Sequence, residues 1–149
     1  MANHEHYYEV NVKWKEGKIG QLSAPGINDN ITCATPPEFS GGVPGIWSPE
    51  HLYAASINSC YMATFLAIAE NFKLALESFE CKTTCKLEMT ENKYQISHAI
   101  IEPGVKLINA LADTEKLNHV LEKAKSACLV TNSIKTVITL KPKTEPVFQ

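Results

Sequence analysis

One stretch decides the fold of this chain: Ser48-Pro49-Glu50-His51-Leu52-Tyr53-Ala54-Ala55-Ser56. A serine accepts a hydrogen bond from the first turn of a helix, a proline fits the first helical position, and a glutamate favours the positive end of the helix dipole. Small and apolar residues then continue on more than one face to about Asn71. This composition predicts a buried helix at the centre of the fold.

Strand-like segments precede this helix. The alternation of residue types predicts a first strand over 7–14 and a returning strand over 19–22, with a turn between them. The segment from there to Trp47 is rich in proline, glycine and asparagine, which indicates a long loop with a possible short strand at 31–34. A loop of this length is usually functional or packed against another part of the protein.

Two long strands and a second helix follow the central helix. The strands are predicted at 74–89 and 94–103, and Asp113 is predicted to cap an amphipathic helix over 114–127. A strand over 134–140 closes the chain. The order of these elements predicts an α+β fold with antiparallel sheets and segregated helices.

Length and charge limit the possible classes. At 149 residues the chain is expected to form a single domain, residues 1–149. The net charge is −2 with both signs interspersed, which argues against a nucleic-acid partner. No signal-peptide core and no run of about 18 apolar residues is present, so we expect a cytoplasmic protein without a membrane span. The 14 basic residues are all lysines.

Five cysteines, an odd number, argue for free thiols or a catalytic pair in a reducing compartment. Cys60 and Cys128 each lie in a helix-like stretch, and they are either small core residues or a redox pair. Cys60 lies twelve residues after Ser48, too far for the helix dipole to lower its pKa. Glu50 lies about 15 Å from Cys60 along one helix, so a joint site needs a second subunit or an indirect role.

Three segments carry a family resemblance. They are Pro37-Glu38-Phe39-Ser40-Gly41-Gly42, the helix start at 48–56 followed by Cys60, and Cys128-Leu129-Val130-Thr131-Asn132-Ser133-Ile134. In this order they resemble the OsmC/Ohr family of osmotically inducible and organic-hydroperoxide-resistance proteins. The resemblance runs from about Val10 to Leu140.

This resemblance implies an OsmC-like fold and an intertwined homodimer with active sites at its interface. It also implies a thiol peroxidase that uses no metal, haem or other cofactor and acts on organic hydroperoxides. Cys60 would be the peroxidatic thiolate, and Cys128 would resolve its sulfenic acid as a disulfide. An external dithiol would then reduce that disulfide. Glu50 matches the catalytic glutamate of the family.

One position departs from the family pattern. The family's peroxidases hold the thiolate and the peroxide with an arginine near the first hairpin, where this chain has Gly17-Lys18-Ile19-Gly20. Lys18 supplies a positive charge without the bidentate fork of arginine. It is either a replacement catalytic residue or a solvated lysine of a turn. Two rival functions therefore remain: a catalytically weak small-molecule binding protein, and a redox-sensing interaction protein.

The other cysteines and the aromatic residues near the motifs are weaker candidates for a functional role. Cys81 and Cys85 on one strand would share a face about 13 Å apart, too far for a disulfide, and no second pair completes a zinc site. Passive packing is therefore favoured for both. Cys33 is expected to be incidental. Several aromatic residues near the motifs either line an apolar pocket or belong to the core: Phe39, Trp47, Tyr53, Tyr61 and Phe65.

Overall fold

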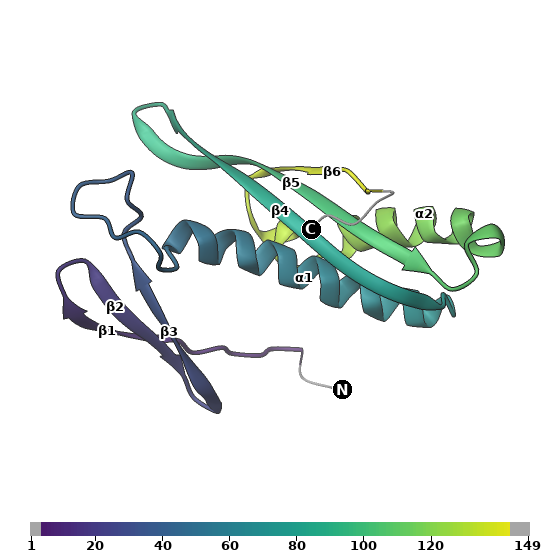
Figure 1. Ribbon diagram of the computed structural model, residues 1–149, viewed down its shortest axis with the longest axis horizontal. Helices are drawn as coiled ribbons and strands as arrows, with labels where there is room; N and C mark the ends of the chain where they lie inside the picture. Colours follow the sequence, from purple (N-terminus) through teal and green to yellow (C-terminus); the bar gives the residue numbers. More distant parts are fainter. Residues whose placement is uncertain (1–3, 144–149) are drawn as a thin grey trace. The chain divides into compact units, whose positions relative to one another are not determined.

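The computed structural model describes residues 4–143, which form strands and helices as the α+β prediction requires (Figure 1). The chain divides into two compact units, Met1–Leu52 and Tyr53–Gln149. Each unit is described by itself, and the single-domain prediction stays a prediction. In chain order the elements are β1 (Asn11–Glu16), β2 (Ile19–Ala24), β3 (Ile27–Ala34), α1 (Pro49–Asn71), β4 (Leu76–Thr90), β5 (Lys93–Leu107), α2 (Ala110–Ala127), the 3-10 helix η1 (Thr131–Ser133) and β6 (Val137–Leu140).

The first unit is built on an antiparallel sheet in the order β1-β2-β3. Gly17 has a φ of 51° and opens the two-residue turn between β1 and β2, where an ordinary side chain would be strained. Gly26 has a φ of 79° after Pro25, the pattern of a type II turn. These two turns return the chain twice within 25 residues.

Two sequence predictions in the first unit are wrong in their bounds. The first strand begins at Asn11, later than position 7. The predicted loop before Trp47 contains a full strand, β3, which starts at Ile27 directly after the turn at Pro25-Gly26. Most of β3 is exposed, so its residues lack the apolar alternation that marks a half-buried strand.

The second unit contains a long antiparallel hairpin of β4 and β5. Glu91 and Asn92 both have positive φ, 50° and 64°, the geometry of a two-residue type I′ turn. β6 pairs with β5 in parallel from His98 to Ile101, so the order is β4-β5-β6 and the sheet is mixed. The antiparallel prediction holds for the other strand pairs.

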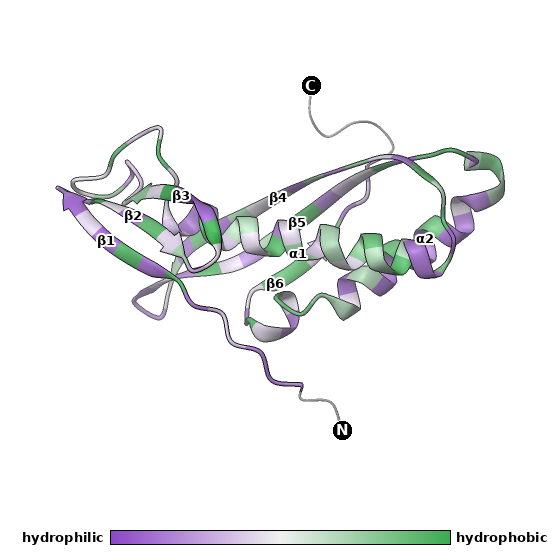
Figure 2. Cartoon of the chain, turned by 90° about the horizontal axis from the view of Figure 1, so that it is seen from below, coloured by the Kyte–Doolittle hydropathy of each residue, from purple (hydrophilic) through white to green (hydrophobic). Residues whose placement is uncertain are grey.

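The helices of the second unit contribute to one core with the hairpin. Figure 2 shows hydrophobic and hydrophilic bands alternating along β4 and β5, as expected for strands with one buried face. Tyr61 and Phe65 of α1 are fully buried, and the Tyr61 hydroxyl donates to the carbonyl oxygen of Leu121 in α2 at 2.9 Å. Two of the aromatic candidates are therefore core residues. The buried cluster comprises Ile57, Tyr61, Phe65, Ala69, Leu74, Cys81, Ala99, Ile101, Val120, Leu121 and Ala124.

Several element boundaries differ from prediction in the second unit: β4 starts at Leu76 and not at 74, and β5 runs to Leu107, past position 103. α2 begins at Ala110 and not after Asp113, because Ala110, Leu111 and Ala112 are good helix formers. Asp113 lies in the first turn, 3.8 Å from the ammonium group of Lys116. β6 starts at Val137, later than position 134, and the 3-10 helix η1 at Thr131–Ser133 precedes it.

Helix α1 has the predicted bounds, but it buries one stripe only. Met62 and Leu66 remain 42% and 40% exposed in the single chain. By length and composition α1 is long and apolar enough to cross a membrane, a property it shares with core helices of soluble proteins. The expectation that the protein has no membrane span stays a prediction.

Candidate thiol site

Cys60 lies in the fourth turn of α1 and is half-buried. Its sulfur is 3.9 Å from Oγ1 of Thr64, one turn further along the same helix face. The backbone groups of both residues lie within the helix. The thiol is therefore carried on a rigid element with one face open to solvent.

Cys128 lies where α2 ends. It is the C-cap residue, with an extended φ of −66° and ψ of 114°, and it is fully buried. Its carbonyl oxygen accepts the Thr131 hydroxyl at 3.1 Å and the Asn132 amide at 3.1 Å. These bonds close a turn that brings the chain after α2 back towards α1.

The structure places the two thiols together, as the redox-pair hypothesis requires. The two thiols are near enough for each to shift the pKa of the other. Burial opposes ionisation of Cys60, but hydrogen bonds from the amide of Val130, the Cys128 thiol, the Thr64 hydroxyl and the amide of Leu129 outweigh it. Together these bonds lower the pKa of Cys60.

The second thiol is shifted in the opposite direction. Burial raises the pKa of Cys128, and its hydrogen bond to Cys60 raises it further, against the lowering effect of Thr131. Of the pair, Cys60 is therefore the one that ionises first, while Cys128 keeps its proton. In such a pair, one sulfur can act as a nucleophile and the second can form a disulfide with it.

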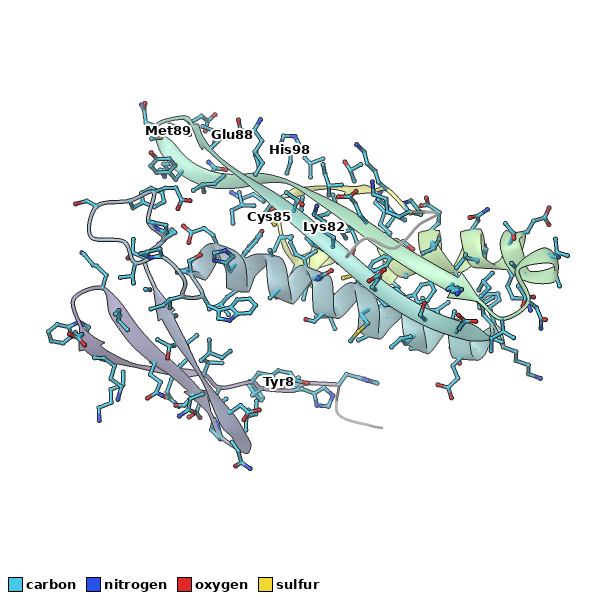
Figure 3. The ribbon with its side chains drawn as sticks, viewed as in Figure 1. Tyr8, Lys82, Cys85, Glu88, Met89 and His98 are labelled. Atoms are coloured by element: carbon cyan, nitrogen blue, oxygen red, sulfur yellow. The ribbon has the colours of Figure 1, made fainter. Side chains whose placement is uncertain are left out.

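The remaining thiols are not part of this cluster. Burial raises the pKa of Cys81 to about 12, and burial also raises the pKa of Cys85. Both lie on β4 and face the core, in agreement with passive packing. Figure 3 labels Cys85 on the hairpin between Lys82 and Glu88. Cys33 belongs to the first unit, on β3 opposite Gly20.

Glu50 and its neighbours form the start of α1. The amide of His51 donates to the Ser48 hydroxyl oxygen at 3.1 Å, which confirms Ser48 as the helix cap. Nδ1 of His51 lies 2.7 Å from that hydroxyl and accepts the Ser48 amide at 3.2 Å. Oε1 of Glu50 is buried and has no hydrogen-bond partner among the described residues.

Lys18 is an exposed residue of the turn between β1 and β2. Its methylene chain lies against Gly41, where an added Cβ would come within 3.3 Å of Cγ and Cε of Lys18. Lys18 and Glu50 both belong to the first unit, whereas Cys60 and Cys128 belong to the second. The roles of Lys18 and Glu50 in a joint site stay predictions.

Sequence reasoning missed three donors at the site: the Thr64 hydroxyl and the amides of Leu129 and Val130. Thr64 has a usable signal, because a hydroxyl four residues after a cysteine shares its helix face. Backbone amides leave no such signal. Among residues 4–143, no group of three His, Cys, Asp or Glu side chains is arranged to hold a metal ion.

Comparisons with known proteins agree with this geometry. The family described as OsmC-like protein matches residues 42–143. No curated protein matches the sequence. An OsmC-like protein of unknown function from Vibrio cholerae is 20% identical, with a TM-score of 0.80, over 93% of this chain and all of that chain.

Two further solved structures share the fold. The organic hydroperoxide resistance protein OsmC of Legionella pneumophila is 19% identical, with a TM-score of 0.74 over 94% of this chain and 97% of that one. The organic hydroperoxide resistance protein OhrB of Bacillus subtilis is 16% identical, with a TM-score of 0.71 over 93% and 98%. At these identities the likeness establishes the fold, and the match over 42–143 establishes the family. The chain belongs to the OsmC-like protein family.

Proposed function

We propose that this protein is a cytoplasmic thiol peroxidase that reduces organic, lipid-type hydroperoxides to alcohols. One observation carries the proposal: Cys60 and Cys128, far apart in sequence, lie near enough to interact, and their contact favours the thiolate of Cys60 over that of Cys128. The names of the Legionella pneumophila and Bacillus subtilis relatives, which refer to organic hydroperoxide resistance, support this class of substrate.

The reaction uses the two sulfurs in sequence. The Cys60 thiolate attacks the distal oxygen of the hydroperoxide, so that an S–O bond forms while the O–O bond breaks. The departing alkoxide takes a proton and leaves as an alcohol, and Cys60 becomes a sulfenic acid. Cys128 then attacks this sulfur, a disulfide forms and water leaves. An external dithiol restores both thiols by exchange.

The proposal includes an intertwined homodimer with Glu50 in its active site. Large apolar side chains are exposed in each unit of the single chain, among them Val12 and Trp14 in the first and Met62 and Leu66 in the second. Surfaces of this kind are typical of protein interfaces. The unpartnered buried oxygen of Glu50 also supports a further contact.

Intact mass spectrometry tests the proposal. We expect one equivalent of an organic hydroperoxide to remove two hydrogens from the reduced protein, and peptide mapping to locate the loss at Cys60–Cys128. A Cys85→Ser variant is the matched control and should lose the same two hydrogens. Thiols that remain unmodified after long exposure would reject the peroxidase.

Lys18 is tested separately. If it replaces the family arginine, Lys18→Met should slow the oxidation of Cys60 by a hydroperoxide, because a positive charge is removed from the peroxide or the thiolate. Lys18→Arg should retain or increase the rate. An unchanged rate for Lys18→Met would make Lys18 a solvated residue of the turn.

A second candidate function is binding of a small apolar ligand. The first unit has a mostly apolar hollow of about 340 Å³, lined by Val10, Leu22, Ser23, Ala24, Ile27, Asp29, Ile31 and Leu52. Its size fits a small ligand. Calorimetric titration with a medium-chain alcohol or fatty acid distinguishes the two functions: tight binding without oxidation of Cys60 favours the binding protein.

A further inference from the structure

The donors around Cys60 differ in kind from the arginine that the family resemblance implies. They are a hydroxyl, a thiol and two backbone amides, and all four are uncharged. The sequence contains no arginine, so no guanidinium from this chain or a second copy can reach the sulfur. A thiolate at this position still needs donors, because burial alone would keep it protonated.

Thr64 is placed by the helix itself. Residues four apart on a helix are neighbours on one face, and Oγ1 of Thr64 lies 3.9 Å from the Cys60 sulfur, within reach of an O–H···S contact. Threonine has few side-chain rotamers in a helix. The hydroxyl is therefore held beside the sulfur with little loss of side-chain entropy.

The amides come from the turn that follows α2. Cys128 is extended and Val130 is helical, with φ −66° and ψ −48°. The carbonyl of Cys128 accepts the Asn132 amide and the Thr131 hydroxyl, which fixes the turn. The amides of Leu129 and Val130 belong to this turn, and both contribute to lowering the pKa of Cys60. Successive amides in a turn form a concave site that favours negative charge.

We propose that Thr64 is a positioning residue which, together with the amides of Leu129 and Val130, holds Cys60 as a thiolate without a neighbouring cation. This inference deepens the proposed function, because it names what activates the attacking sulfur. It assigns no thiolate-stabilising role to Lys18, so any part that Lys18 takes in the reaction would be contact with the peroxide.

The test measures ionisation of Cys60 without peroxide. Alkylation of reduced full-length protein by iodoacetamide is followed at the Cys60 peptide by mass spectrometry from pH 5 to 10. Thr64→Val keeps the shape of the side chain and removes the donor, so we expect Cys60 alkylation at pH 6.5 to slow by about threefold to tenfold. Thr64→Ser restores the donor and should restore the wild-type pH profile.

Ser59→Ala is the matched control, because it removes a hydroxyl of the same helix that donates to the carbonyl of Ser56. Its pH profile should equal that of the wild type. Raising sodium chloride from 0.02 to 1 M should shift the wild-type profile little, since uncharged donors are not screened as a lysine would be. The inference would be overturned if Thr64→Val showed the same pH profile as the wild type. It would also be overturned if salt shifted the wild-type profile by as much as the Thr64→Val substitution is expected to shift it.

A backbone variant tests the turn independently. Val130→Pro removes one amide donor, and the φ of −66° at this position suits proline. We expect Val130→Pro to slow Cys60 alkylation at pH 6.5, whereas Val130→Ala keeps the amide and should not slow it. Circular dichroism checks that both variants are folded. Equal pH profiles for the two folded variants would count against a contribution from the amide. A profile that behaves as expected in a protein that does not reduce hydroperoxides would reject the proposed function alone.

Discussion

Two sets of cysteines in the second unit have different surroundings. Cys60 is half-buried among four donors, and its pKa is lowered. Cys81 and Cys85 face the core from β4, and burial raises their pKa values. Cys81 also receives hydrogen bonds, but they do not offset its burial. The difference teaches that the balance of donors against desolvation decides which thiol is reactive, and that a count of cysteines does not.

The largest difference between the two sets is expected in turnover. Cys60→Ser removes the proposed nucleophile, so hydroperoxide reduction should fall to the uncatalysed background, a loss of about 10⁴-fold or more. Cys85→Ser should keep most of the activity. The measurement is consumption of an organic hydroperoxide with a dithiol reductant. Equal losses in both variants would show that the comparison is wrong.

The next largest difference is expected in alkylation. At pH 8 a thiol with a pKa of about 12 is almost wholly protonated. We therefore expect Cys60 to react with iodoacetamide at least about 10³ times faster than Cys81. A time course of modified peptides, read by mass spectrometry in native protein, gives both rates. Comparable rates would mean that the core around Cys81 opens readily.

For stability, the substitution at Cys81 should have a larger effect than the substitution at Cys60, the reverse of the order expected for activity. Cys81 is 8% exposed and belongs to the core cluster, so Cys81→Ser buries a hydroxyl and should reduce the free energy of unfolding by about 1–3 kcal/mol. Cys60→Ser, at a half-buried position beside polar donors, should cost less than about 1 kcal/mol. Urea unfolding of both variants makes the test, and a larger cost at Cys60 would contradict it.

The smallest effect concerns alkaline pH. The Cys81 thiol ionises near pH 8.5 in the unfolded chain but only at about 12 in the folded one, so the unfolded state gains stability as pH rises between these values. From pH 8 to 9 this thiol should lower the free energy of unfolding by about 0.7 kcal/mol. In Cys81→Ala, the free energy of unfolding should fall less steeply with rising pH, because this thiol is absent. An identical slope in the variant would assign the effect to other groups.

The sequence predicted some elements well, for physical reasons. The bounds of α1 follow from local chemistry, because Ser48 and Pro49 act within one turn. β3 was not predicted in full, because an exposed strand lacks the apolar alternation that reports burial. The cap of α2 was placed at Asp113 because side-chain chemistry was weighed above the helix propensity of Ala110 and its neighbours.

The candidate site was predictable in part. The proximity of Cys60 and Cys128 followed from the resemblance and not from spacing, since tertiary packing of two helices is not encoded in a local pattern. The amides of Leu129 and Val130 were beyond sequence reasoning, because any residue except proline supplies the same N–H group. Glu50 and Lys18 remain predictions, since they belong to the other unit.

In the proposed redox cycle, the position of Cys128 at the end of a helix would determine which part of the protein moves. Cys60 lies within α1, so bond formation between the sulfurs shifts the turn at 128–133 more easily than the helix. That turn carries Leu129, whose side chain is 70% exposed. If the proposed disulfide forms, oxidation inside the protein would change the position of an apolar side chain on its surface, and a partner that contacts Leu129 would distinguish the reduced from the oxidised form without touching either sulfur.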